Sequence, residues 1–148
     1  MELLVVIAIT AILAVASTTD FLGYRNRNRL NLAGEEIGSL LRTVHNRAIS
    51  QEAQSAWGVR FTSSAGGDDY YYEVFYGASY PGTKVSEKHL DSALKFLQPE
   101  NNAVTTTIFS QITGDASHRS PLIVIISLRS DESASTTVTV YPNGRVEY

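Results

Sequence analysis

The chain begins with a single acidic residue followed by a long apolar run without charge. Glu2 precedes residues 3–16, whose one hydroxyl group belongs to Thr10, and the next charged residue is Asp20. This composition is typical of a helix that is apolar on all sides and that lipid or protein covers. A lone carboxylate in such a helix is costly, at about 2.5–3.5 kcal/mol near the centre of a membrane and less towards an end. We therefore expect Glu2 to form an ion pair with a cation outside this segment.

The same residues resemble a known family. Residues 2–9 (ELLVVIAI) and 11–14 (AILA) closely resemble the N-terminus of type IV pilins and type II secretion pseudopilins, over residues 2 to about 30. In that family a prepilin peptidase cuts after a glycine, and the new N-terminal residue, usually Phe, is methylated on its nitrogen. Because the family glutamate lies four residues after that Phe, the resemblance places the leader and the cleavage site upstream of Met1. It also implies that Glu2 pairs with the N-terminal amine of a neighbouring subunit.

The resemblance implies that the first part of the helix spans the membrane before assembly and lies in the filament core afterwards. Residues 3–16 are fewer than the about 20 that a span needs, and residues 17–19 extend them tolerably. The side chains expected in the membrane or filament core are Leu3, Leu4, Val5, Val6, Ile7, Ile9, Ile12, Leu13 and Val15. A cleaved secretory signal is the competing interpretation, since Ala14-Val15-Ala16 is similar to a cleavage site, but the acidic start argues against it.

Beyond Asp20 the pattern predicts an amphipathic helix. Apolar residues recur at steps of three and four, at Leu30, Ala33, Ile37, Leu40, Leu41, Val44, Ala48 and Ile49. We predict one long helix over residues 2 to about 53, loosened near residues 18–24. Residues 1–19 form its transmembrane or filament-core part, and residues 20–53 form an amphipathic part that packs on a sheet. Gly34 and Gly38 would allow another segment to approach this helix closely.

Three arginines, Arg25, Arg27 and Arg29, lie between the two parts of the helix. The positive-inside rule places them in the cytoplasm, whereas pilin topology places them outside. We favour the family topology, because pilin leaders carry their own basic residues on the cytoplasmic side. The expected role is a solvated collar at the membrane surface, with contacts to lipid headgroups or neighbouring subunits as the alternative. A net charge of −3 and the lack of aromatic residues among the arginines argue against nucleic-acid binding.

The rest of the chain, residues 54–148, predicts a globular domain rich in β-structure. Strands are expected at 57–61, 70–76, 92–97, 104–109, 122–128 and 137–141, with 146–148 closing a hairpin over Asn143-Gly144. Residues 77–103 are mixed: Gly77, Pro81 and Gly82 interrupt regular structure before the strand expected at 92–97. The continuous apolar run at 122–128 predicts a central strand covered on both faces. The predicted fold class is therefore α+β, with a long N-terminal helix packed on an antiparallel β-sheet domain that resembles a pilin.

The sequence contains no motif for catalysis, for a cofactor or for a metal ion. His45, His89 and His118 lie far apart in unlike contexts, and no phosphate-binding loop or nucleophile elbow is present. The absence of cysteine excludes disulfides, thiol chemistry and cysteine metal sites. Residues 63–69 contain adjacent glycines and aspartates, but their spacing does not match an EF-hand, which favours a turn over a calcium loop.

A group of tyrosines is the remaining candidate for binding. Tyr70, Tyr71, Tyr72, Tyr76 and Tyr80 could present an aromatic surface to a sugar, a partner or stacked bases. Alternation along a strand favours the opposite interpretation, in which one set of rings lies in the core and the other at its edge.

Together these features predict a structural subunit rather than an enzyme. The resemblance implies a minor pilin or pseudopilin of a type IV pilus-like or type II secretion filament. The terminal hairpin and the strand at 57–61 resemble those of H-type minor pseudopilins. The implied partners are other pilin subunits, prepilin peptidase and the cytoplasmic membrane. The β-domain would lie on the periplasmic or extracellular side of a single-pass membrane protein and later in a filament.

Two alternatives remain at this point. The first is a filament-tip or membrane-tethered module that binds a surface, DNA or an export substrate. The second is an ordinary anchored or secreted β-domain that is unrelated to pilins.

Overall fold

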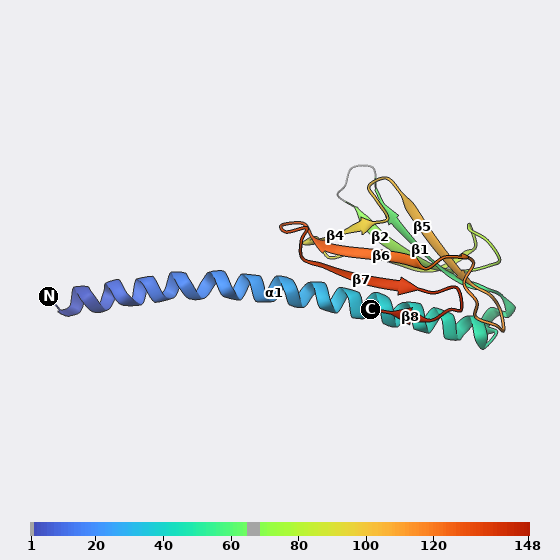
Figure 1. Cartoon of the computed structure of the whole chain (residues 1–148), viewed down its shortest axis with the longest axis horizontal. Helices are drawn as coiled ribbons and strands as arrows, with labels where there is room; N and C mark the ends of the chain where they lie inside the picture. The colour runs from blue at the N-terminus through green and yellow to red at the C-terminus, as the bar shows by residue number, and fades with distance from the viewer. Residues whose placement is uncertain (1, 65–68) are drawn as a thin grey trace.

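A long helix is the axis of the molecule. The computed structural model describes residues 2–64 and 69–148, and for residues 2, 4 and 11–22 it describes the backbone alone. Helix α1 (Glu2–Ile49) has 48 residues and is about 70 Å long at 1.5 Å per residue. Its N-terminal part projects far beyond the β-domain (Figure 1). The backbone is helical through residues 18–24, so the predicted loosening there is wrong.

The helix ends earlier than the sequence pattern indicates. The prediction extends it to residue 53, but a short 3₁₀ turn, η1 (Glu52–Gln54), follows Ile49. Gln51, Ala53 and Gln54 have φ angles of 59°, 57° and 49°, in the left-handed region, which an α-helix cannot continue through. No glycine or proline lies between Gly38 and Gly58, so the sequence carries no stop signal for this turn.

Over its described residues, 54–64 and 69–148, the β-domain forms two antiparallel sheets of four strands each. The first has the order β3-β2-β1-β5 and contains β1 (Trp57–Ser63), β2 (Tyr70–Tyr76), β3 (Thr83–His89) and β5 (Val104–Phe109). The second has the order β4-β6-β7-β8 and contains β4 (Leu94–Gln98), β6 (Leu122–Leu128), β7 (Ser135–Val140) and β8 (Val146–Glu147). The α+β architecture predicted from the sequence is confirmed.

Strand β3 is the element that the sequence pattern misses. All seven of its residues are exposed, so its sequence does not alternate between apolar and polar side chains. It is an edge strand that pairs with β2 alone, and a bulge interrupts the pairing between Val74 and Phe75. The prediction for β6 is half right: the strand lies centrally between β4 and β7, but Ile123 is 43% exposed and is therefore not covered.

One apolar core joins the helix to both sheets. The helix contributes Leu30, Ile37, Leu41, Val44 and Ala48, which recur at the steps that the sequence pattern predicts. The sheets contribute aromatic rings, among them Phe61, Phe96 and Phe109, together with aliphatic residues of both sheets. Among the helix side chains that the structure describes, Leu30 is the first that is buried, and the β-domain lies against the C-terminal part of the helix (Figure 1).

The strand tyrosines divide as alternation predicts. Tyr70 and Tyr72 of β2 are buried against the core, whereas Tyr71 between them is half-buried on the other face of the sheet. Residues 65–68, which include most of the turn that the sequence predicts at 63–69, lie outside the described residues. The pairing of β1 with β2 confirms the hairpin on either side of that turn.

Two helix glycines seat the C-terminal hairpin. A Cβ atom added at Gly34 would lie 2.9 Å from Oγ1 of Thr136 on β7, and one added at Gly38 would lie 2.7 Å from Cγ of Tyr148. Arg42, one turn further on, donates a hydrogen bond of 3.1 Å to the carbonyl oxygen of Val146 and stacks on the Tyr148 ring at 4.7 Å. The predicted close approach of another segment to these glycines is confirmed.

Candidate assembly surface on the N-terminal helix

The projecting part of α1 carries apolar side chains at residues 3–9 that, within the described part of the chain, remain exposed. Successive residues of a helix are about 100° apart, so side chains close together in sequence point in all directions around the axis. The described apolar side chains at this end are 53% to 73% exposed and comprise Leu3, Val5, Val6, Ile7 and Ile9. An apolar surface on all sides of a helix needs a cover of lipid or protein.

The one polar side chain described in this stretch is satisfied within the helix. The hydroxyl of Thr10 donates to the carbonyl oxygen of Val6 at 2.9 Å and lies 3.0 Å from that of Ile7. A hydroxyl bonded to its own helix does not need a hydrogen-bond partner from water. Thr10 can therefore be covered by an apolar environment at little cost.

The predicted site residues lie on this part of α1. The backbones of Glu2, Leu4, Ile12, Leu13 and Val15 are helical, but their side chains lie outside the described residues. The ion pair expected of Glu2 thus stays a prediction. Across the described part of the chain, no helical segment is both long enough and apolar enough to cross a membrane.

The arginines form a collar where the helix meets the β-domain, immediately before Leu30. Nη1 of Arg29 lies 3.9 Å from Oδ1 of Asp91, in the connection between β3 and β4. Hydrogen bonds from Ser133 hold the pKa of Asp131 below its usual value, and the charge of Arg27 adds to this effect. Exposed ion pairs of this kind contribute about 0–1 kcal/mol. The contacts of the collar with these two loops therefore add little to stability.

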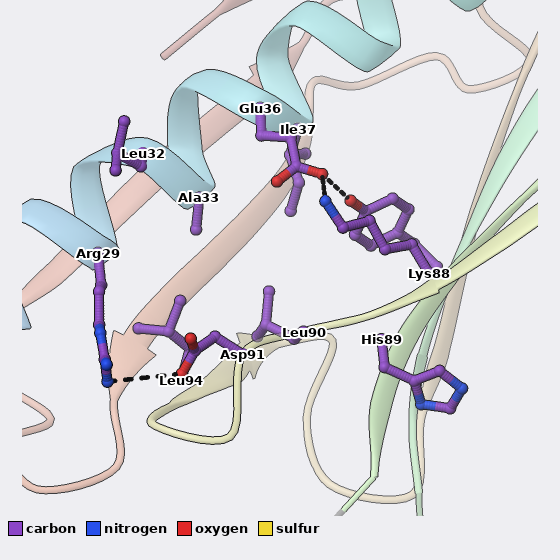
Figure 2. A pocket seen from close by; sticks show the side chains of 11 residues that line it. Arg29, Leu32, Ala33, Glu36, Ile37, Lys88, His89, Leu90, Asp91 and Leu94 are labelled. Carbon is purple, nitrogen blue, oxygen red and sulfur yellow. Dashed lines mark hydrogen bonds and ion pairs between the residues drawn. The ribbon is translucent and has the colours of Figure 1, made fainter.

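A groove of about 350 Å³ opens beside the collar, between α1 and the connection from β3 to β4 (Figure 2). Ala33, Ile37 and Leu94 supply apolar lining. Its charged side chains are paired within the chain, as the ion pairs of Arg29 with Asp91 and of Lys88 with Glu36 show in Figure 2. The groove therefore offers an incoming ligand few unpaired polar groups.

Glu36 ties the helix to the first sheet. The hydroxyl of Tyr72 donates to Oε1 of Glu36 at 2.5 Å, and Nζ of Lys88 donates to the same oxygen. Partial burial acts to raise the pKa of Glu36, but the hydrogen bonds from Lys88 and Tyr72 outweigh it and leave the pKa below its usual value. Burial and the neighbouring carboxylate raise the pKa of Tyr72, so its hydroxyl stays a donor. Sequence reasoning missed this contact because it joins residues 36, 72 and 88, which no motif links.

One arrangement in the β-domain has the form of a nucleophile paired with a histidine. Nδ1 of His118 donates to the carbonyl oxygen of Ser120 at 2.7 Å, and Nε2 lies within hydrogen-bond distance of the hydroxyl of Thr107, at 3.2 Å. Thr107 is fully buried in β5, so a substrate cannot reach its hydroxyl. The contact instead fixes the loop after β5. Among the described residues, no group of three or more potential metal ligands comes together.

Solved structures identify the architecture. No protein-family model and no curated protein sequence matches the chain. The type IV minor pilin FimU of Pseudomonas aeruginosa strain PAO1 aligns with 80% of this chain and 90% of its own, with a TM-score of 0.56 and 16% identity. A second crystal form of the same minor pilin aligns with 84% of this chain and 90% of its own, with a TM-score of 0.59 and 15% identity. The chain has a pilin fold. At this identity the likeness describes the fold, and it bears out the pilin-like α+β architecture expected from residues 2–30.

Proposed function

We propose that this chain is a structural subunit of a type IV pilus-like or type II secretion filament, a minor pilin or pseudopilin. The observation that carries the proposal is the N-terminal end of α1, where the described apolar side chains among residues 3–9 are exposed, attached to a domain with a pilin fold. A helix of this kind, held outside its own domain, is suited to packing against the same part of neighbouring subunits.

In the proposed mechanism the helix has two successive environments. Prepilin peptidase removes a leader upstream of Met1 and frees an α-amine, and residues 1–19 then lie in the cytoplasmic membrane with the β-domain on the periplasmic or extracellular side. During assembly these residues move into the filament core. Glu2 pairs there with the N-terminal amine of a neighbouring subunit.

Typical energies indicate how much apolar burial and the ion pair of Glu2 each contribute to assembly. Burying one exposed Val, Leu or Ile side chain contributes about 1.5–3 kcal/mol relative to water, so the described apolar side chains alone favour a covered state strongly. An ion pair in apolar surroundings gains Coulomb energy but loses hydration of both ions, and the two contributions nearly cancel. Apolar packing therefore provides the affinity, and Glu2 sets the register and recruits the next subunit.

The H-type character is a finer part of the same proposal. The hairpin of β7 and β8 closes over Gly144, whose φ of +79° suits the turn, and β1 follows the helix after a short turn. Both features support a minor subunit over a major one. Measuring the fraction of all subunits in purified filaments that are this chain tests its assignment as a minor subunit. A fraction close to one would contradict the assignment.

Replacing Glu2 tests the assembly mechanism. Glu2→Ala and the isosteric Glu2→Gln are expected to prevent incorporation into sheared filaments, measured by immunoblot. Glu35→Ala, which removes an exposed carboxylate from the same helix, is the matched control and should incorporate normally. Fluorescence of Trp57, the single tryptophan, reports whether the β-domain is folded in each variant. Normal incorporation of Glu2→Ala would show that the proposed role of Glu2 is wrong.

A further inference from the structure

A shallow cleft of about 640 Å³ lies where η1 meets the connection between β2 and β3. We name it the distal cleft; residues 53–55, 76–79 and 81–83 line it. It lies near the C-terminal end of α1, which is the end far from the N-terminus in Figure 1. A ligand in this cleft would therefore leave the proposed assembly surface free.

The distal cleft is uncharged and rich in polar groups. None of the residues that line it is charged, in a chain of which 18% is charged. Its lining residues include Gln54, whose side chain ends in an amide, and Ser55, Ser79 and Thr83, whose side chains carry hydroxyls. Within the described part of the chain, none of these four side chains makes a hydrogen bond. In the groove of Figure 2, by contrast, the charged groups already pair with one another.

The remaining lining combines an aromatic ring with small residues. Tyr76 is half-buried and its ring lies 5.5 Å from that of Trp57, which supports it from the core. Gly77, Ala78 and Gly82 add only small side chains, or none, to the lining. An aromatic ring beside amide and hydroxyl groups suits a sugar, because C–H groups of the sugar contact the ring while its hydroxyls exchange hydrogen bonds.

The backbone of η1 holds its part of the cleft in a strained conformation. Ala53 and Gln54 have left-handed φ angles, which are unfavourable for residues other than glycine. Two hydrogen bonds maintain the conformation: N–H of Gln54 donates to the carbonyl oxygen of Gln51 at 2.9 Å, and Nε1–H of Trp57 donates to that of Glu52 at 2.8 Å. Strain that neighbouring contacts maintain is concentrated at binding sites, where it fixes a side chain before the ligand arrives.

We propose that the distal cleft binds a neutral saccharide, with the side chains of Gln54 and Thr83 as hydrogen-bonding groups and Tyr76 as the apolar contact. Acidic sugars and nucleic acids lack a counter-charge in this lining and are excluded as ligands. The site goes beyond the proposed filament role, because it would give an assembled subunit a separate binding activity.

Saturation-transfer NMR on the full chain tests the site. The chain is kept in lauryldimethylamine oxide, a detergent without a sugar headgroup, and is probed with lactose, maltose, cellobiose and N,N′-diacetylchitobiose. We expect transfer to at least one of these neutral disaccharides and none to digalacturonate. Absence of transfer to all four, or equal transfer to digalacturonate, would overturn the proposal.

Matched variants locate the binding. Gln54→Ala is expected to weaken the affinity for the bound disaccharide about five- to tenfold, as for the loss of one hydrogen bond. Gln98→Ala, which removes an exposed amide on β4, should leave the affinity unchanged. Trp57 fluorescence confirms that each variant is folded. Equal affinity of Gln54→Ala and the unaltered chain would refute the assignment, even if filament assembly proceeds as proposed.

Discussion

Replacing Gly38 by alanine tests how the C-terminal hairpin is held on the helix. In an exposed helix interior this change stabilises by about 1 kcal/mol, because alanine has the higher helix propensity. Here the added Cβ would lie 2.5 Å from Cε1 and 2.7 Å from Cγ of Tyr148, distances that a real Cβ does not tolerate. The Tyr148 ring must move away. The net change in the free energy of unfolding is then the gain in helix propensity minus the loss of the contacts that the ring makes.

The cost follows from those contacts. Moving the ring breaks the stacking on Arg42, which contributes about 0.5–1 kcal/mol at an exposed site. It also breaks the hydrogen bond of 3.2 Å from Nη1 of Arg42 to the Tyr148 hydroxyl, which contributes about 0.5–1.5 kcal/mol. After the propensity gain of about 1 kcal/mol is subtracted, Gly38→Ala should destabilise by about 0–1.5 kcal/mol.

A double-mutant cycle isolates the clash. Urea unfolding followed by Trp57 fluorescence gives the free energy of unfolding for each variant, since this tryptophan is the only one in the chain. In a Tyr148→Ala background, Gly38→Ala should stabilise by about 1 kcal/mol, so the coupling between the two sites is about 1–2.5 kcal/mol. Gly23→Ala, whose added Cβ meets nothing within 4 Å, is the control and should not destabilise. A coupling near zero would refute the reasoning.

Two further predictions concern the core. Leu41→Ala removes a fully buried side chain and should lower the free energy of unfolding by about 2–5 kcal/mol in the same urea assay, and a loss below that range would contradict its placement. Burial lowers the pKa of His45, and Asp115 partly offsets this. The folded pKa is thus below the unfolded value of about 6.5, so stability is full above that pH and declines as the pH falls towards the folded pKa. Comparing unfolding of the unaltered chain and His45→Gln at several pH values should show that the variant lacks this part of the decline; equal declines would contradict it.

The elements that the sequence predicts are those with a strong local pattern. The helix core positions from Leu30 to Ala48 were predictable, because one side of the helix packs on a domain and the other faces solvent. Strand β3 was not, because an exposed edge strand buries neither face and so has no alternation. The early end of α1 was not predictable either, since Gln51 and Ala53 are ordinary helix formers that adopt left-handed angles only in this tertiary context.

The candidate sites likewise include one that the sequence predicts and others that it does not. The apolar surface of the projecting helix follows from composition alone, and residues 3–9 mark it in the sequence. The partners of the collar and the lining of the distal cleft cannot be inferred from composition, because Asp91 lies in a loop and the cleft is formed by η1, the connection between β2 and β3, and the first residue of β3. Contacts between loops leave no periodic signal in a sequence.

Cysteine crosslinking along the helix tests the filament proposal most directly. The chain has no cysteine, so Ile9→Cys and Gln98→Cys each introduce a single thiol into it. Both positions are exposed, one on the projecting helix and the other on the β-domain. We predict that a short bis-maleimide added to assembled material links Ile9→Cys subunits to neighbouring pilin subunits and leaves Gln98→Cys subunits unlinked. Absence of crosslinks at Ile9, or equal crosslinking at both positions, would contradict the assignment of the projecting helix as the assembly surface.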